Sequence, residues 1–93
     1  MREKTMRPEV VEVLIREKSA SEMAIARLQE KIRPLESRYG WTTEEFLEKF
    51  EKGEAGDEQD YFLWYALAEA IEDWKRTRDG LVELLDDAEK VSV

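Results

Sequence analysis

The stretch YGWTTEEFLEKFEKGEAGD, residues 39–57, contains the two chain breaks that decide how this protein folds. Gly40 can adopt the left-handed conformation that commonly ends a helix. Thr42 and Glu45 have the spacing of a capping box, in which each side chain bonds the backbone at the start of one helix. A glycine-containing loop then closes the stretch. The stretch as a whole therefore predicts a short helix over about 43–52, with one long helix before it and another after it.

The segment before this stretch has the apolar spacing of a long helix over about 8–39. Pro8 suits a first helical position, where its missing N–H costs nothing. Apolar residues then recur mostly in steps of three and four, at Val11, Leu14, Ile25, Leu28, Ile32, Leu35 and Tyr39. Lys18 and Ser21 interrupt this stripe with a polar notch. Because no glycine occurs there and the stripe keeps its phase, we favour one continuous helix over two helices broken near 19–21.

A third helix is expected over about 58–88. Asp57 can cap its first turn, where carboxylates also suit the positive end of the helix dipole. Its apolar stripe again advances in steps of three and four, through Trp64, Leu67, Ile71, Trp74, Arg78, Leu81, Leu85 and Ala88. This regular spacing favours packing against a neighbouring helix.

The predicted fold class is all-α, with a single domain over residues 1–93. We expect an antiparallel long-helix hairpin, about 8–39 and 58–88, with the short helix, about 43–52, lying across its connected end. Residues 1–7 are expected to form a disordered tail. A chain of this length buries only roughly 60–65% of its unfolded surface, so its core is thin. We therefore expect a homodimer.

Antiparallel packing would bring the polar notch of the first helix, which comprises Lys18, Ser21 and Glu22, opposite Arg78 of the third. Two readings of Arg78 remain open. It can form an ion pair with Glu22 or Glu17, which would fix the register of the two helices. Alternatively, its aliphatic stem packs along the apolar stripe while its guanidinium reaches water.

The composition excludes several classes of function. The chain has 93 residues, no His, no Cys and a net charge of −8. Without His or Cys, the usual catalytic triads and zinc sites cannot form, so we expect no enzyme activity and no metal or cofactor. No apolar run reaches the length of a membrane span, and we expect a cytoplasmic protein without membrane contact. Abundant Glu, Lys and Arg without Asn is typical of thermophile proteins.

The charge is also unevenly distributed along the chain. Residues 1–40 hold nine basic and seven acidic side chains, a net charge of +2. Residues 41–93 hold six basic and sixteen acidic side chains, a net charge of −10. A nucleic-acid-binding protein needs a basic face, so no nucleic-acid partner is expected. The acidic half instead suits a basic protein partner.

One carboxylate pattern leaves an enzymatic alternative open. Glu44, Glu45 and Glu48 could hold Mg²⁺ together with Glu83 and Asp86, for attack on a nucleoside triphosphate. This spacing is similar to that of the all-α nucleotide pyrophosphatases. A capping box, a helix dipole and a solvated helix face explain the same carboxylates, and we favour that explanation.

A run of five large apolar residues, Tyr61-Phe62-Leu63-Trp64-Tyr65, points in every direction around its helix. Either the short helix covers the whole run, or some of these side chains are exposed. Exposed aromatic side chains beside carboxylates are typical anchors of protein interfaces. A structural bundle that buries the run by self-association is the second candidate function.

Segments 38–46 and 51–54, followed by acidic residues and an aromatic-rich helix, resemble small acidic helical antitoxins of archaea and some bacteria. The resemblance covers about residues 30–75. It implies a helical antitoxin that occludes a toxin, often of ribonuclease type. Many antitoxins begin with a strand that builds a DNA-binding dimer, and Met1 to Met6 lacks the alternating pattern of such a strand.

The preferred function is therefore a protein-binding module, antitoxin-like, that covers a basic partner with an acidic and aromatic surface. The predicted partner-binding residues are Trp41, Glu48, Glu51, Asp57, Asp60, Tyr61, Phe62, Trp64 and Tyr65.

Overall fold

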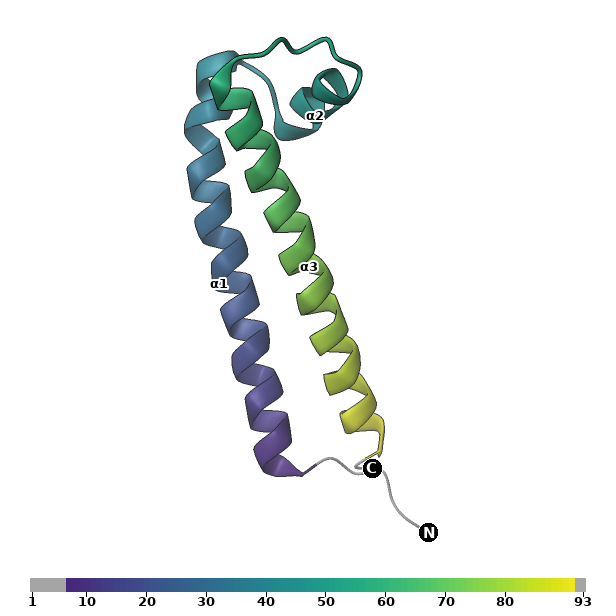
Figure 1. Cartoon of the computed structure of the whole chain (residues 1–93). Helices are drawn as coiled ribbons and strands as arrows, with labels where there is room; N and C mark the ends of the chain where they lie inside the picture. The colour runs from purple at the N-terminus through teal and green to yellow at the C-terminus, as the bar shows by residue number, and fades with distance from the viewer. Residues whose placement is uncertain (1–6, 92–93) are drawn as a thin grey trace.

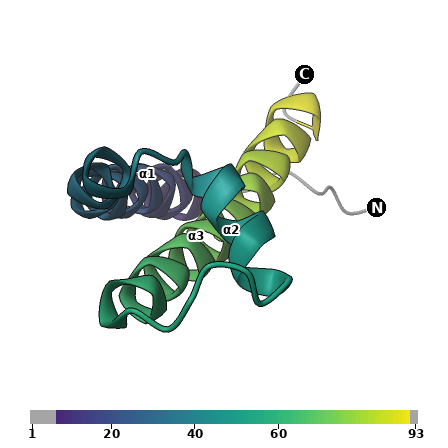
Figure 2. The same ribbon diagram turned by 90° about the horizontal axis from the view of Figure 1, so that it is seen from above.

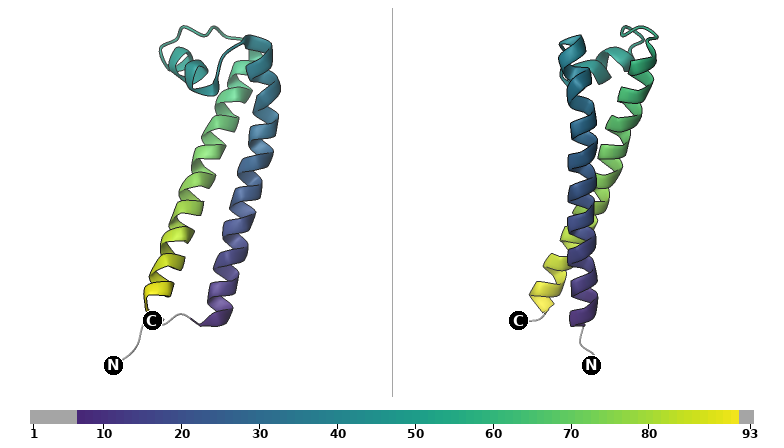
Figure 3. Two further views of the ribbon diagram at one scale, coloured as in Figure 1. Left: turned by 180° about the vertical axis from the view of Figure 1, so that it is seen from behind. Right: turned by 90° about the vertical axis from the view of Figure 1, so that its left-hand side faces the viewer.

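A computed structural model of the chain describes residues 7–91, which form three α-helices (Figure 1). Helix α1 spans Pro8–Tyr39, α2 spans Thr43–Glu51 and α3 spans Gln59–Val91. The two long helices lie side by side and antiparallel, and α2 lies at their connected end (Figure 3). The predicted all-α hairpin with a short intervening helix is therefore confirmed.

The predicted tail, residues 1–7, lies outside the described residues except for Arg7, the residue that precedes α1. Helix α1 runs without a break through the polar notch, as the phase of its apolar stripe predicts. Helix α3 extends three residues beyond the predicted end at Ala88. Gly40 has a positive φ of 72°, which ends α1 in the left-handed conformation.

The polar side chains of the notch form their hydrogen bonds and ion pairs within their own helices and not across the hairpin. Ser21 is 1% exposed, and its hydroxyl donates a hydrogen bond to the Glu17 carbonyl at 2.9 Å. Glu22 pairs with Lys18 one turn away, at 3.3 Å. Arg78 pairs with its neighbour Asp79, at 3.1 Å.

The predicted ion pair between Arg78 and Glu22 or Glu17 is therefore not formed. A carboxylate of its own helix lies within reach of Arg78, and Glu22 is already paired along α1. The Arg78 side chain is 32% exposed. This agrees with the other reading, in which its guanidinium reaches water.

The core lies in the half of the hairpin that α2 covers. The buried cluster consists of Ile25, Ile32, Leu35, Phe46, Tyr61, Trp64, Leu67 and Ile71. The molecule measures 60 × 22 × 16 Å, so it is long and thin. We call the α2-covered half the capped end. The other half, residues 8–20 of α1 and 72–88 of α3, is the open end.

The predicted capping box fixes the start of α2. The Thr42 hydroxyl accepts a hydrogen bond from the Glu45 backbone N–H at 3.1 Å, and the Glu45 carboxylate accepts one from the Thr42 N–H at 2.9 Å. Seen from above, α2 lies beside α3 (Figure 2). The capping box therefore orients a helix whose single fully buried side chain, Phe46, points to the core.

A polar network joins all three helices at the capped end. The Trp64 indole N–H donates to the Thr43 hydroxyl at 3.1 Å. That hydroxyl and the Thr43 backbone N–H donate to the Glu36 carboxylate at 2.9 and 2.8 Å. The buried indole nitrogen of Trp64 is thus satisfied, as buried polar groups generally are.

Candidate interaction surface

Three of the predicted partner-binding residues stabilise the fold instead. Tyr61 is 6% exposed and Trp64 is 0% exposed, because α2 packs over their side of α3. The Asp60 carboxylate accepts hydrogen bonds from the Arg38 guanidinium at 2.5 Å and from the Tyr39 hydroxyl at 2.8 Å. Tyr61 and Trp64 therefore belong to the core, and Asp60 holds the start of α3 against the end of α1.

Trp41 has an intermediate position between core and surface. It is half-buried, and its ring lies 5.9 Å from that of Tyr61 and 6.3 Å from that of Tyr39. The Lys49 ammonium lies 5.5 Å from the centre of the indole, at cation–π distance. One side of Trp41 therefore packs on the core, and a lysine rather than a carboxylate lies over its ring.

An aromatic patch remains on the outside of α2 and α3. Its members are Phe50, Phe62 and Tyr65. The Phe50 ring meets that of Phe62 edge-on at 5.8 Å and stacks on that of Tyr65 at 5.0 Å. Phe62 is 57% exposed, and the other two are half-buried. The short helix thus covers only part of the run at 61–65, and the expectation of exposed aromatic side chains is met by Phe62.

Two carboxylates, Glu51 and Glu69, lie near the Tyr65 side of this patch. Glu44, Glu48 and Glu51 are spaced by four and three residues, so they share one stripe of α2, and all three are exposed. The negative charge of Glu69, followed by burial and the charge of Glu51, raises the pKa of Tyr65 above its usual value. The aromatic patch therefore lies in a region of negative potential.

Asp57, also predicted as a partner contact, is exposed in the loop between α2 and α3. The structure thus keeps Glu48, Glu51, Asp57, Phe62 and Tyr65 accessible. It brings Glu51, Phe62 and Tyr65 together, and it adds Phe50 and Glu69, which the sequence argument missed. The signal for Phe50 was present, because Phe50 lies one turn after Phe46 on α2.

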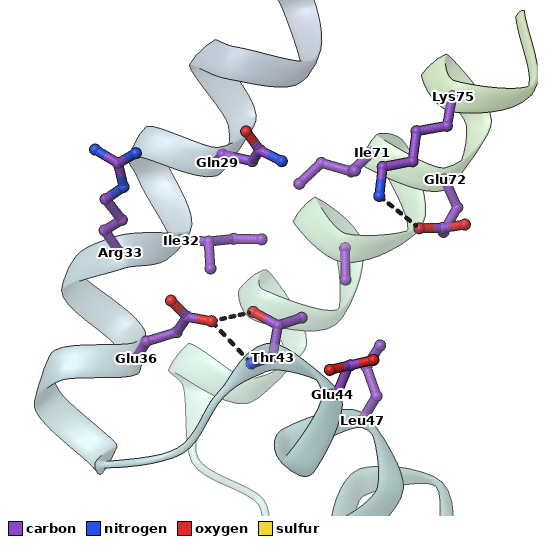
Figure 4. A pocket seen from close by; sticks show the side chains of 11 residues that line it. Gln29, Ile32, Arg33, Glu36, Thr43, Glu44, Leu47, Ile71, Glu72 and Lys75 are labelled. Atoms are coloured by element: carbon purple, nitrogen blue, oxygen red, sulfur yellow. Dashed lines mark hydrogen bonds and ion pairs between the residues drawn. The ribbon is translucent and has the colours of Figure 1, made fainter. Parts of the chain in front are cut away.

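A groove of about 470 Å³ lies between the three helices on the α2 side (Figure 4). Apolar side chains of Ile32, Leu47, Ala68 and Ile71 line it. Charged and polar side chains line the rest, from Gln29, Arg33, Glu36, Thr43, Glu44, Glu72 and Lys75. Lys75 pairs with Glu72 at 3.7 Å. Glu44 therefore belongs to both the groove and the acidic stripe of α2.

The five carboxylates of the Mg²⁺ hypothesis do not converge. Among residues 7–91, no three acidic side chains are placed to hold a metal ion. Glu44 and Glu72 both line the groove, whereas Glu83 lies eleven residues beyond Glu72 along α3. At about 1.5 Å per residue this separates Glu83 from Glu72 by about 16 Å. The spacing that suggested a nucleotide pyrophosphatase site is therefore not matched in space.

The capped end therefore carries the aromatic patch, the acidic stripe and the groove. None of the described helices has the length and apolar character needed to cross a membrane. Comparison with known proteins adds no relative, because neither a protein-family model, nor a curated protein, nor a solved structure matches this chain.

Proposed function

We propose that this protein is an antitoxin-like binding module, which covers a functional surface of a basic partner protein in the cytoplasm. The contact face consists of α2 and the N-terminal half of α3. The observation that supports it best is the aromatic patch: Phe62 is 57% exposed, yet it lies beside two half-buried aromatic rings, with two carboxylates near Tyr65. Aromatic anchors of this kind contribute much of the binding energy in protein interfaces.

Charge defines the chemistry of the partner. Residues 41–73 hold eleven acidic and two basic side chains, a net charge of −9. A surface of this sign attracts a basic protein and accelerates their association. Proteins that bind or cut nucleic acid carry basic surfaces for the phosphate backbone. Carboxylates on α2 can take the place of those phosphates, so the face suits occlusion of such a surface.

The resemblance of segments 38–46 and 51–54 to small acidic antitoxins narrows the class of partner protein further. It favours a toxin of ribonuclease type over other basic proteins. Within this proposal, Phe62 and Tyr65 enter an apolar depression of the toxin, and Glu48 and Glu51 meet its basic residues. Tyr61, Trp64 and Asp60 have no direct part, since they hold the face together from inside.

The experiment is a quantitative capture from the native cytosol with tagged protein. The test variant is Phe62→Ala/Glu51→Lys, and the control is Met23→Ala/Glu30→Lys. The control makes comparable changes on α1, where Met23 is 52% exposed and Glu30 is also at the surface. We expect wild type and control to retain one basic protein in stoichiometric amount, and the test variant to lose it.

Two results would count against the proposal. One is equal retention of the basic protein by the test variant. The other is recovery of no protein except further copies of the tagged chain. If the basic protein is retained as expected, its ribonuclease activity is then measured with and without this chain, and inhibition at equimolar ratio is the expected result.

A further inference from the structure

Helix α3 carries a second apolar stripe beside the one that packs on α1. It advances in alternating steps of four and three residues, the spacing of a coiled-coil seam. We call it the outer seam, and its members are Leu63, Leu67, Ala70, Trp74, Thr77, Leu81 and Leu84.

The outer seam is uncharged, and six of its seven positions are exposed or half-buried. The exception is Leu67, which is 9% exposed and belongs to the core. Leu63 is 54% exposed, Trp74 is 39% exposed and Leu84 is 46% exposed. By contrast, the stripe that contains the buried Ile71 continues at the same spacing through two cations, Lys75 and Arg78. A row of seven uncharged positions in a helix rich in charge indicates that another surface covers it.

The order of residues along the outer seam identifies that surface. Read from Trp74 outward, the seam is nearly the same in both directions: a small residue comes first, Ala70 or Thr77, and two leucines follow on each side. A two-fold axis through Trp74 would therefore set Leu63 against Leu84 of a second copy and Ala70 against Thr77, with Leu67 already buried within its own copy. Such self-complementarity is what a two-fold interface requires.

The small residues also make the centre of this row feasible. Ala70 and Thr77 lie one turn before and after Trp74, and they leave room for a second indole. Trp74 is the only one of the nine aromatic side chains that contacts none of the other aromatic rings. Its ring is therefore free to pair across the axis.

The exposed area agrees with a missing partner. The chain exposes 6918 Å², whereas a compact monomer of 11.0 kDa exposes about 5,600 Å². The excess of about 1,300 Å² is that of the whole chain, residues outside 7–91 included, and a standard interface takes ~800 Å² from each partner. In the open end, Ala88 is the one buried residue among residues 8–20 of α1 and 72–88 of α3, so this half has no third layer.

We propose that a second copy of the chain covers the outer seam, in an antiparallel two-fold dimer centred on Trp74. Antiparallel packing places the two capped ends, each with a net charge of −9 over residues 41–73, at opposite ends of the assembly. Parallel packing would bring them together and would be opposed by repulsion. The aromatic patch stays free, because Phe62 and Tyr65 lie about 100° and 200° around α3 from Leu63.

The first test is the mass of the protein in solution, measured by sedimentation equilibrium over a range of concentrations. We expect a dimer whose dissociation constant rises at least roughly 30-fold in Trp74→Glu, since truncating a central Trp anchor typically costs about 2 kcal/mol or more. The control is Phe62→Glu, at a more exposed aromatic position outside the seam (57% against 39% for Trp74), which should keep the wild-type mass. A monomer at all concentrations, or a dimer unaffected by Trp74→Glu, overturns the proposal.

The second test fixes the orientation and does not depend on the stability of a variant. The chain contains no Cys, so any disulfide that forms must join the introduced cysteines. We expect Leu63→Cys/Leu84→Cys to form an intermolecular disulfide under mild oxidation, and each single variant to form none at the same protein concentration. A disulfide in the single Leu63→Cys variant would show parallel packing and overturn the antiparallel register. Because the test reads only contacts between copies, it can fail while the binding of a basic partner holds.

Discussion

The ring of Phe46 lies parallel to the indole of Trp64, with the centroids 4.2 Å apart and the planes inclined by 3°. Both side chains are fully buried, and they come from α2 and α3. Ring contacts continue outward from this pair through Tyr39 and Tyr61 to Trp41, and through Phe50 to the aromatic patch. The surface that we assign to partner binding is therefore continuous with the core of the capped end.

Removing the Phe46 ring should destabilise the whole protein. Phe46→Ala removes a fully buried ring and leaves a cavity against Trp64, so we expect a loss of about 3–5 kcal/mol in the free energy of unfolding. Urea denaturation followed by circular dichroism measures it. Phe62→Ala deletes the same ring from a side chain that is 57% exposed and should cost less than about 1 kcal/mol. Equal losses in the two variants would contradict the assigned core.

The hydroxyl of Thr43 should matter more than its methyl group. Thr43→Val keeps the shape of the side chain but leaves the buried indole N–H of Trp64 without an acceptor, which costs about 1–3 kcal/mol. Thr43→Ser restores the acceptor and should lie within about 0.5 kcal/mol of wild type. Thermal unfolding of both variants measures the difference. Equal stability of Val and Ser at this position would mean that the hydrogen bond contributes nothing.

Two tyrosines should resist ionisation in the folded protein. The hydroxyl of Tyr39 donates to Asp60, and this bond raises its pKa; the charge of Glu69 raises the pKa of Tyr65. Both shifts favour the neutral form in the folded state. Their contribution to stability is therefore full below the unfolded pKa of about 10 and is lost as the pH rises through the folded values.

The measurement is the tyrosinate absorbance during alkaline titration. Wild type should ionise at higher pH than the same chain in urea. In a Tyr39→Phe background, Glu69→Gln should move the remaining titration toward lower pH, because the main cause of the shift at Tyr65 is removed. A titration that is identical in folded and unfolded protein would rule out both shifts.

Charge reversal on α2 should act on the rate of association. Glu48→Lys/Glu51→Lys weakens the long-range attraction of a basic partner, so the association rate constant at low salt should fall about tenfold or more, and its salt dependence should flatten. Glu12→Lys/Glu83→Lys makes the same change of net charge at the open end and is the control. Surface plasmon resonance with the captured partner measures both. Rate constants that fall equally in the two variants would indicate a general charge effect.

Much of the fold was predictable because its signals are local. The capping box at Thr42 and Glu45, and the glycine at position 40, set the two ends that matter most for the topology. The continuity of α1 through Ser21 followed from the phase of the apolar stripe. The ion-pair partner of Arg78 was harder to predict, because the neighbouring Asp79 competes with every carboxylate across the hairpin.

The surface was less predictable, because it depends on where α2 lies. Five large apolar residues in succession at 61–65 do not indicate which of them α2 covers. Asp60 looked like a free first-turn carboxylate, and its contacts with Arg38 and Tyr39 span more than twenty residues of sequence. The groove lined by Ile32 and Ala68 left no sequence signal, since it arises between elements distant in the chain.

Helix α2 has one face that the fold constrains and another that it leaves free. Phe46 and the capping box hold the inner face against the hairpin, whereas the stripe of Glu44, Glu48 and Glu51 makes no contact that the fold needs. Over evolutionary time the inner positions should therefore change slowly. The outer positions can follow changes in a partner, so that one hairpin could serve a lineage of related proteins with different binding preferences.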